Sequence, residues 1–189
     1  MNRDQNHAIR VGEWMKAKGY QDRDHSFMAL AEYIAFEKRG LVKQGLLLTG
    51  TVGSGKTTFL NLFLRCFTTA SIHKAQGLSN LFMRENEEFM RLIYPDSYQV
   101  LPDCYWDFAI DDLGQEDPVN YYGVKQEVLE QVLSARYDAF KAHGGRTFLS
   151  TNLDMQQLKH RYGDRIESRL HEMCVVVPFN AQDYRKGGR

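Results

Sequence analysis

Apolar and polar positions alternate along this chain in blocks that predict strands and helices following one another. Runs rich in apolar or β-branched residues predict strands within residues 45–49, 68–73, 106–112, 146–152 and 174–179. Apolar side chains at helical spacing predict helices within residues 59–67, 75–93, 124–140, 154–161 and 163–170. Strands that alternate with helices are typical of α/β proteins, so we expect a parallel sheet flanked by helices.

Two short amphipathic helices are expected ahead of the first strand. Residues 5–18 and 25–39 each place apolar side chains on one face, and a glycine follows each segment. A unit of this size is too small to hold a core of its own. We therefore expect a helical arm over residues 1–40, packed against a core domain over residues 41–189.

The first core strand runs directly into a glycine-rich loop. Gly50, four further residues, Gly55, Lys56 and Thr57 match the phosphate-binding loop, in the strand-loop-helix context that this loop requires. Glycines allow positive φ, so successive N–H groups can point at phosphate oxygens, and the helix N-terminus adds its positive dipole end. The candidate nucleotide-binding residues are Gly50, Thr51, Val52, Gly53, Ser54, Gly55, Lys56, Thr57 and Thr58.

Two carboxylates end the strand predicted at residues 106–112. Asp111 and Asp112 follow a mostly apolar run, about 55 residues after Lys56 in the sequence. Ligands bind at the carboxyl ends of parallel strands in open α/β sheets. Lys56 would reach the β- and γ-phosphates, Thr57 and Asp111 are candidate ligands of Mg²⁺, and Asp112 is a candidate to orient or deprotonate the attacking water.

Two further polar residues have both a structural and a functional interpretation. Asn152 ends the strand next to the Asp111 strand and could contact the γ-phosphate or the attacking water, although a turn asparagine is favoured by its position alone. Arg136 lies among apolar positions of a predicted helix. A solvated arginine is favoured there over one that faces a nucleotide or a neighbouring subunit.

Composition narrows the class of protein. The 189 residues carry 24 basic and 24 acidic side chains, so the net charge gives no support for a nucleic-acid or membrane partner. Three scattered cysteines without metal-ligand spacing predict neither a disulfide framework nor a zinc site. No apolar run approaches the ~20 residues of a membrane span, and there is no signal-peptide pattern. We expect a soluble, cytoplasmic protein.

Four motifs in this order resemble those of the AAA+ ATPases, closest to DnaC-type helicase loaders and IstB-type transposition helpers. Residues 50–58 resemble Walker A, and residues 110–114 resemble the Asp-Asp-Leu-Gly form of Walker B in that branch. Residues 150–153 resemble sensor 1, and residues 162–170 resemble the arginine-finger box. The resemblance runs from about residue 40 to the C-terminus, and four ordered motifs are far more specific than one.

The resemblance implies an ATPase of the P-loop NTPase fold (AAA+ type) that uses ATP and Mg²⁺ and works as an oligomer. Asp112 and Asn152 would position water, and Arg169, or less favourably Arg165, would enter a neighbour's active site. Single-stranded DNA and a replicative helicase or a transposase are the implied partners. The branch has a reduced lid, in which Arg185 is a candidate nucleotide contact.

Loader and transposition helper both remain open from the sequence. Outside the resembled branch, the alternatives are a small-molecule P-loop kinase and a scaffold that binds nucleotide without hydrolysing it. A kinase needs an acceptor pocket and usually an arginine-rich lid, neither of which the sequence indicates. A scaffold would not need the two carboxylates and the Lys-Thr pair, all of which are intact.

Overall fold

The fold is that of a computed structural model, which describes residues 44–68, 70–94 and 107–179 together with Glu13 and Tyr33. Its strands are β1 (Gly45–Gly50), β2 (Ile72–Lys74), β3 (Phe108–Leu113), β4 (Val119–Tyr121), β5 (Val124–Gln126), β6 (Thr147–Thr151) and β7 (Cys174–Phe179). Its helices are α3 (Lys56–Phe67), α4 (Ala75–Arg84), α5 (Asn86–Ile93), α6 (Val128–His143) and α7 (Met155–Met173).

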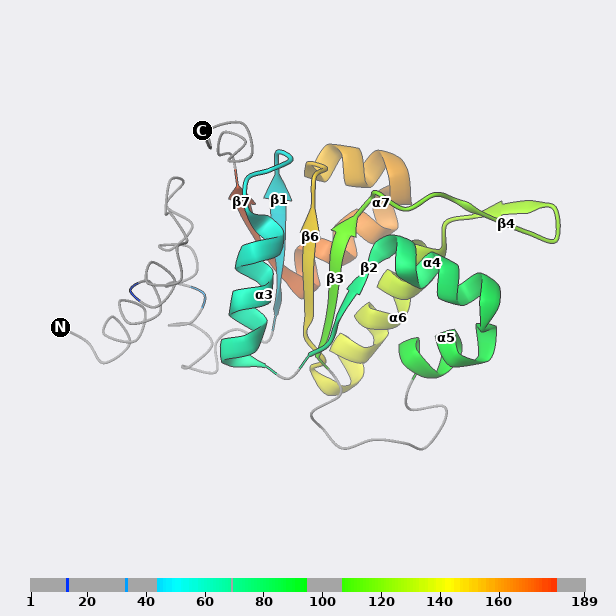
Figure 1. Cartoon of the computed structure of the whole chain (residues 1–189), viewed down its shortest axis with the longest axis horizontal. Helices are drawn as coiled ribbons and strands as arrows, with labels where there is room; N and C mark the ends of the chain where they lie inside the picture. Colours follow the sequence, from blue (N-terminus) through cyan, green and yellow to red (C-terminus); the bar gives the residue numbers. More distant parts are fainter. Residues whose placement is uncertain (1–12, 14–32, 34–43, 69, 95–106, 180–189) are drawn as a thin grey trace.

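Five strands form one parallel sheet in the order β2-β3-β6-β1-β7, visible side by side in Figure 1. β1 is an inner strand, because Leu47 pairs with Leu149 of β6 on one side and with Val176 of β7 on the other. All five strands run in the same direction, so their carboxyl ends meet at one edge. The parallel sheet flanked by helices that the sequence predicts is confirmed.

Two apolar clusters, one on each face of the sheet, hold the layers together. Leu46 and Leu48 of β1 pack with Phe59 and Phe63 of α3, whereas Leu47 belongs to the larger cluster with residues of α4, α5, α6 and α7. Successive strand side chains point to opposite faces, which accounts for this division. Leu46, Leu47 and Leu48 are all fully buried, as expected for a strand covered on both faces.

Two predicted helices differ from those observed. The sequence predicts one helix over residues 75–93, but α4 and α5 meet at Glu85, whose backbone is not helical (φ −140°, ψ 64°). The helix predicted over residues 124–140 begins only at Val128, because Val124 belongs to a hairpin formed by β4 and β5. Glu85 does not disturb the spacing of the apolar positions around it, so the break between α4 and α5 could not be predicted from that spacing.

The β4–β5 hairpin extends away from the sheet (Figure 1). Its two turn residues, Tyr122 and Gly123, have φ of 50° and 81°, and positive φ at both positions is what a two-residue type I′ turn requires. Tyr122 at the tip is 90% exposed. Gly123 was the sequence signal for a turn, but the apolar positions that follow it lie at helical spacing and favoured a helix.

Arg136 contradicts its expected position on a solvated helix surface. The side chain is only 1% exposed and lies inside the core between α6 and the sheet. Its Nε donates to Thr147 Oγ1 at 3.2 Å, its Nη2 donates to the Arg146 carbonyl at 3.3 Å, and its guanidinium lies 5.3 Å from the centre of the Phe108 ring. Arg136 therefore stabilises the packing of α6 on β3 and β6.

The backbones of β1 and β6 approach each other most closely where β1 begins. A Cβ atom added at Gly45 would lie 1.8 Å from the carbonyl oxygen of Thr147, which is far inside any van der Waals contact. Only glycine fits this position without moving a strand of the central sheet.

α7 consists of two helical segments, as the sequence predicts. A capping box begins the first segment, in which Asp154 accepts from the Gln157 N–H and the Gln157 side chain accepts from the Asp154 N–H. Gly163 separates the segments with φ of 84°, a value that favours glycine. The second segment carries Arg165 and Arg169.

The predicted arm over residues 1–40 and the candidate Arg185 lie outside the described residues, apart from two helical positions. Of these, Tyr33 is buried, donates its hydroxyl to the Gln44 carbonyl at 2.6 Å and packs edge-on against Phe63. Across the described ranges, every helix is too short or too polar to span a bilayer.

Candidate nucleotide-binding site

The glycine-rich loop between β1 and α3 leaves the first backbone N–H groups of α3 without a side-chain cap. Gly55 caps α3 in the left-handed conformation (φ 94°, ψ 9°), and no side chain caps this helix. Gly53 also has positive φ, at 79°. Both conformations favour glycine, and together they turn the backbone into the helix so that its first N–H groups can bind an anion.

Lys56 holds this loop together from within. Its side chain is buried, and Nζ donates to the carbonyls of Gly50 at 2.9 Å and Thr51 at 2.7 Å and to Ser54 Oγ at 3.2 Å. Burial lowers the pKa of Lys56, although the nearby carboxylates oppose the shift. The ammonium thus lies inside the predicted phosphate cradle. Of the other loop residues, Val52 and Thr58 have exposed side chains.

Asp111 joins the phosphate loop to the acid-ended strand. The Thr57 hydroxyl donates to Asp111 Oδ1 at 3.0 Å, across 54 residues of sequence, and the Ser150 hydroxyl donates to the same oxygen. Burial alone would raise the pKa of Asp111, but hydrogen bonds from Lys74, Ser150 and Thr57 outweigh burial and lower it. The carboxylate is therefore held ionised at the edge of the sheet.

A bulge in β3 brings the second carboxylate to the same side. Adjacent strand residues ordinarily point to opposite faces, but the pairing register of β3 with β6 shifts between Ile110 and Leu113, and Asp112 has φ of 60°. As a result Lys74 Nζ lies 2.5 Å from Asp111 Oδ2 and 2.6 Å from Asp112 Oδ2. The bulge thus gathers two consecutive acids around one cation.

The oxygen atoms at this junction fit a magnesium site. No group of three or more histidine, cysteine or acidic side chains is clustered for metal binding in the described ranges. Mg²⁺ needs no such cage, since proteins bind it through one or two carboxylates, water and substrate phosphates. Thr57 and Asp111 supply oxygens of that kind, and the ammonium already held by Asp111 shows that this carboxylate attracts a cation.

Asn152 follows the end of β6, the strand between β1 and β3. The preceding residue, Thr151, pairs with Leu113, and its hydroxyl donates to the Leu113 carbonyl at 2.6 Å. Asn152 therefore follows a strand end that is hydrogen-bonded to the end of β3, next to Asp112. The prediction that its strand neighbours the Asp111 strand is correct.

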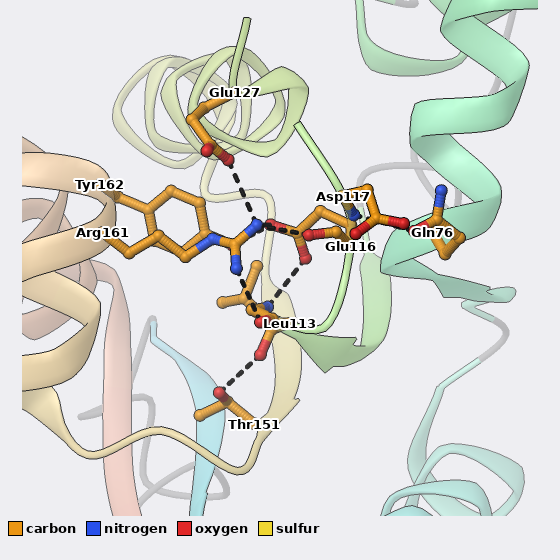
Figure 2. A network of polar contacts seen from close by, with 9 residues as sticks. Gln76, Leu113, Glu116, Asp117, Glu127, Thr151, Arg161 and Tyr162 are labelled. Carbon is orange, nitrogen blue, oxygen red and sulfur yellow. Dashed lines mark hydrogen bonds and ion pairs between the residues drawn. The ribbon is translucent and has the colours of Figure 1, made fainter. Parts of the chain in front are cut away.

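A buried network, shown in Figure 2, ties the end of β3 to α7. Glu116 is buried, and its carboxylate accepts from the Gly114 N–H at 2.9 Å and from the Tyr162 hydroxyl, and lies 3.0 Å from Arg161 Nη2. Arg161 also donates to the Gly114 carbonyl at 2.9 Å and lies 3.3 Å from Glu127. The loop after the two aspartates is thereby fixed to the first segment of α7.

The same loop is also fixed to α4. The Asp117 N–H donates to Gln76 Oε1 at 2.9 Å, and both residues are drawn in Figure 2. The segment between β3 and the β4–β5 hairpin is therefore held from both sides, by α4 and by α7. Movement of α4 or α7 would therefore displace the end of β3, which carries the aspartates.

The two candidate finger arginines lie away from the phosphate loop. The α7 segment that carries Arg165 and Arg169 ends where β7 begins, and Cys174 pairs with Gly45 at the amino end of the sheet. The loop begins at the other end of β1, roughly 16 Å away at ~3.3 Å per strand residue. α7 also packs on the opposite face from α3. The structure therefore does not bring these arginines to the loop of the same chain.

Arg169 is partly buried beside Tyr137 of α6. Its guanidinium carbon lies 4.7 Å from the centre of the Tyr137 ring, and its Nη1 is buried without a hydrogen-bond partner in the described part of the chain. A buried guanidinium N–H without an acceptor is costly. Arg165, one turn earlier, is exposed.

Four residues of the site escaped the sequence analysis: Lys74, Glu116, Ser150 and Arg161. Ser150 stands inside the segment that resembles sensor 1, and Lys74 directly follows a predicted strand, but neither residue was assigned a role. Their partners depend on strand order and on the bulge, which apolar spacing does not report. Glu116 and Arg161 are charged residues that ordinary patterns assign to the surface.

Solved structures of similar fold include a DnaC helicase loader, with a TM-score of 0.60 and 14% identity over 86% of this chain and 94% of that one. DnaI is similar with a TM-score of 0.59 and 21% identity, over 87% of each chain. AMPPCP-bound DnaA from Aquifex aeolicus has a TM-score of 0.58 and 15% identity, over 88% of this chain and 50% of that one.

These similarities confirm the expected fold, that of the AAA+ P-loop NTPases. At these identities they carry the fold alone. No family model matches the chain, and no curated protein matches it in sequence.

Proposed function

We propose that this protein is a Mg²⁺-dependent ATPase that hydrolyses ATP in an oligomer and serves DNA replication as a helicase-loader-like protein. The observation that carries the ATPase part is the hydrogen bond from Thr57 to Asp111, which joins the phosphate loop to the acid-ended strand. A glycine-rich surface turn of no function would have no reason to meet a buried carboxylate 54 residues away.

The chain's own residues divide the chemistry between them. Lys56 would exchange its loop carbonyls for the β- and γ-phosphates, with the backbone of residues 50–55 surrounding the phosphate oxygens. Thr57 and Asp111 would hold Mg²⁺, which when bound supplies neutralisation of phosphate charge. Asp112 and Asn152 would orient the attacking water, and Asp112 would accept its proton.

Arg169 is proposed to act on a neighbouring subunit. Its location toward the far end of the sheet and on the far face from α3 argues against a role at its own phosphate loop. An arginine supplied in this way is worth ~10³–10⁵ in rate where it has been studied.

The role in replication is proposed from the resemblance in sequence motifs and from the similarity in fold. Among structures of similar fold is a DnaA bound to AMPPCP and single-stranded DNA, with 16% identity. We propose ATP, further copies of this chain, single-stranded DNA and a replicative helicase as partners. A transposase in place of the helicase would make the protein a transposition helper with the same ATPase site.

The test is ATP hydrolysis measured over a series of protein concentrations, with and without single-stranded DNA. Specific activity should rise with protein concentration and rise further with DNA, and Lys56→Ala should abolish nucleotide binding. Flat activity would contradict a shared active site. Activity that depends on a small acceptor molecule would indicate a kinase, and tight ATP binding without turnover would indicate a scaffold.

Mixing two inactive variants tests the shared site directly. Asp112→Asn should disable hydrolysis in its own subunit while keeping its arginine, and Arg169→Ala should do the reverse, each slowing turnover by ~10³ or more. An equimolar mixture should regain activity that neither variant has alone. Failure to regain activity, with both variants folded and binding ATP, would contradict action of Arg169 on a neighbour.

A further inference from the structure

Lys74 contacts both aspartates of the candidate site, but the proposed ATPase mechanism gives it no role. It is the last residue of β2, where it pairs in register with Asp111 of β3. Its Nζ lies 2.5 Å from Asp111 Oδ2 and 2.6 Å from Asp112 Oδ2. One ammonium thus contacts both carboxylates that metal binding and water activation require.

Asp111 has no oxygen without a donor in this state. Oδ1 accepts from Thr57 and Ser150, and Oδ2 accepts from Lys74. Oδ2 has a single donor, so a cation that approaches this carboxylate there, directly or through water, comes to lie beside the Lys74 ammonium, whereas at Oδ1 it competes with Thr57 and Ser150. The identity of the donor that leaves decides how the site responds to Mg²⁺.

Lys74 is the donor that can leave at least cost. Ser150 is buried and also accepts from the Asp112 N–H, so its departure would orphan a backbone donor. Thr57 belongs to the first turn of α3, and its hydroxyl is itself a proposed ligand of Mg²⁺, so it has no reason to leave the site when the metal binds. Lys74 has a flexible side chain that is 57% exposed, so its ammonium can return to water.

Retention of Lys74 beside a bound metal is unfavourable. A divalent cation at Asp111 Oδ2 would lie within a few ångströms of an ammonium, and like charges at that distance repel, more strongly near a protein than in bulk water. Binding of the metal and release of Lys74 are therefore coupled. A competitor built into the site raises the metal concentration needed to fill it.

We propose that Lys74 is an internal counter-cation of Asp111 and Asp112, which competes with Mg²⁺ and sets the Mg²⁺ concentration at which the site fills. The inference deepens the proposed ATPase function and rests on it for the identity of the metal. Without Mg²⁺ the chain itself supplies one positive charge to the two carboxylates. With Mg²⁺ the ammonium is freed, and Asp112 loses its ion pair with Lys74.

The test is a Mg²⁺ titration of three variants and the wild type with two readouts. The first is the thermal stability of the nucleotide-free protein, and the second is the binding of a fluorescent ADP. Lys74→Gln should lower the half-saturating Mg²⁺ concentration by about two- to fivefold, the range expected for losing a partly exposed ion pair. Lys74→Arg, which keeps the charge, should stay close to the wild type.

Lys125→Gln is the matched control, because Lys125 is an exposed lysine on the β4–β5 hairpin. Its half-saturating Mg²⁺ concentration should equal that of the wild type. An unchanged or higher value in Lys74→Gln would overturn the proposal. If no variant and no wild-type protein binds ADP, the proposed function fails, while the thermal readout with Mg²⁺ alone still decides the role of Lys74.

A measurement on the wild type covers the case in which Lys74→Gln does not fold. Reductive methylation read by mass spectrometry reports the accessibility of each lysine amine. Methylation of Lys74 should rise severalfold when Mg²⁺ is added, with or without ADP, whereas Lys125 should not change. Unchanged or reduced methylation of Lys74 would show that the ammonium stays on the carboxylates, and the proposal would be wrong.

Discussion

At the scale of single residues, Gly45 matters because it has no side chain. The carbonyl oxygen of Thr147 occupies the space that a Cβ would need, so β1 and β6 can run side by side only with glycine here. β1 leads directly into the phosphate loop, and β6 leads to Asn152. The spacing of these two strands therefore sets the distance between two parts of the candidate site.

Gly45→Ala should lower the free energy of unfolding by more than about 3 kcal/mol, because the clash is with backbone and can be relieved only by moving a strand. The measurement is chemical denaturation of the purified protein.

Gly77→Ala is the control for this prediction. Gly77 lies inside α4, is exposed, and a Cβ there would meet only the Lys74 Cβ at 3.7 Å, an ordinary contact. This variant should be more stable than the wild type by about 0.4–1 kcal/mol. Equal destabilisation by both substitutions would contradict the assigned role of Gly45.

At the scale of elements, the Glu116 network decides how the carboxylate strand and α7 move together. Glu116 follows β3 in sequence, whereas Tyr162 and Arg161 belong to the first segment of α7. Burial, followed by the adjacent Glu116 carboxylate, raises the pKa of the Tyr162 hydroxyl, so it remains a donor at any physiological pH. The network is a rigid connection between the aspartates and the helix that carries the arginines.

Tyr162→Phe should lower the free energy of unfolding by about 1.5–3 kcal/mol, because it removes a buried hydrogen bond to a charged group. Tyr137→Phe removes a hydroxyl that donates to the exposed Glu172 and should lower the free energy of unfolding far less. Denaturation of both variants provides the comparison. A larger loss in Tyr137→Phe would show that the network contributes little.

At the scale of the whole molecule, the two halves of the proposed ATPase chemistry face different directions. The phosphate loop, Asp111 and Asp112 lie at the carboxyl end of the sheet, while Arg169 lies toward the amino end. In the proposed mechanism, a second copy placed against the first would supply this arginine.

ATP with Mg²⁺ should therefore increase the mass of the particle in solution, since bound nucleotide would be contacted by two chains. Light scattering during size-exclusion chromatography measures this mass. Lys56→Ala, which should not bind nucleotide, is the control and should keep the mass of the nucleotide-free protein. A wild-type mass that does not respond to ATP at any protein concentration would contradict the shared site.

Contiguous motifs in the sequence predicted the loop and the strand that carry candidate residues. Contacts that depend on strand pairing across the sheet were missed. The loop at Gly50 to Thr57 and the Asp111 strand were identified because their motifs are contiguous. Lys74 could not be placed at the carboxylates without the strand order and the bulge. Arg136 was expected in water, because a charge among apolar positions is usually at a surface, yet its bonds to Thr147 and Arg146 keep it inside.

The position of β1 between β6 and β7 has a consequence for how the protein is made. Leu47 pairs with Leu149 and Val176, so both neighbours of β1 leave the ribosome on the order of 100 residues after it. At ~5–20 residues per second, β1 waits on the order of ten seconds for its partners. During synthesis its leucines are exposed, and the nascent chain is a natural client for chaperones until β7 has emerged.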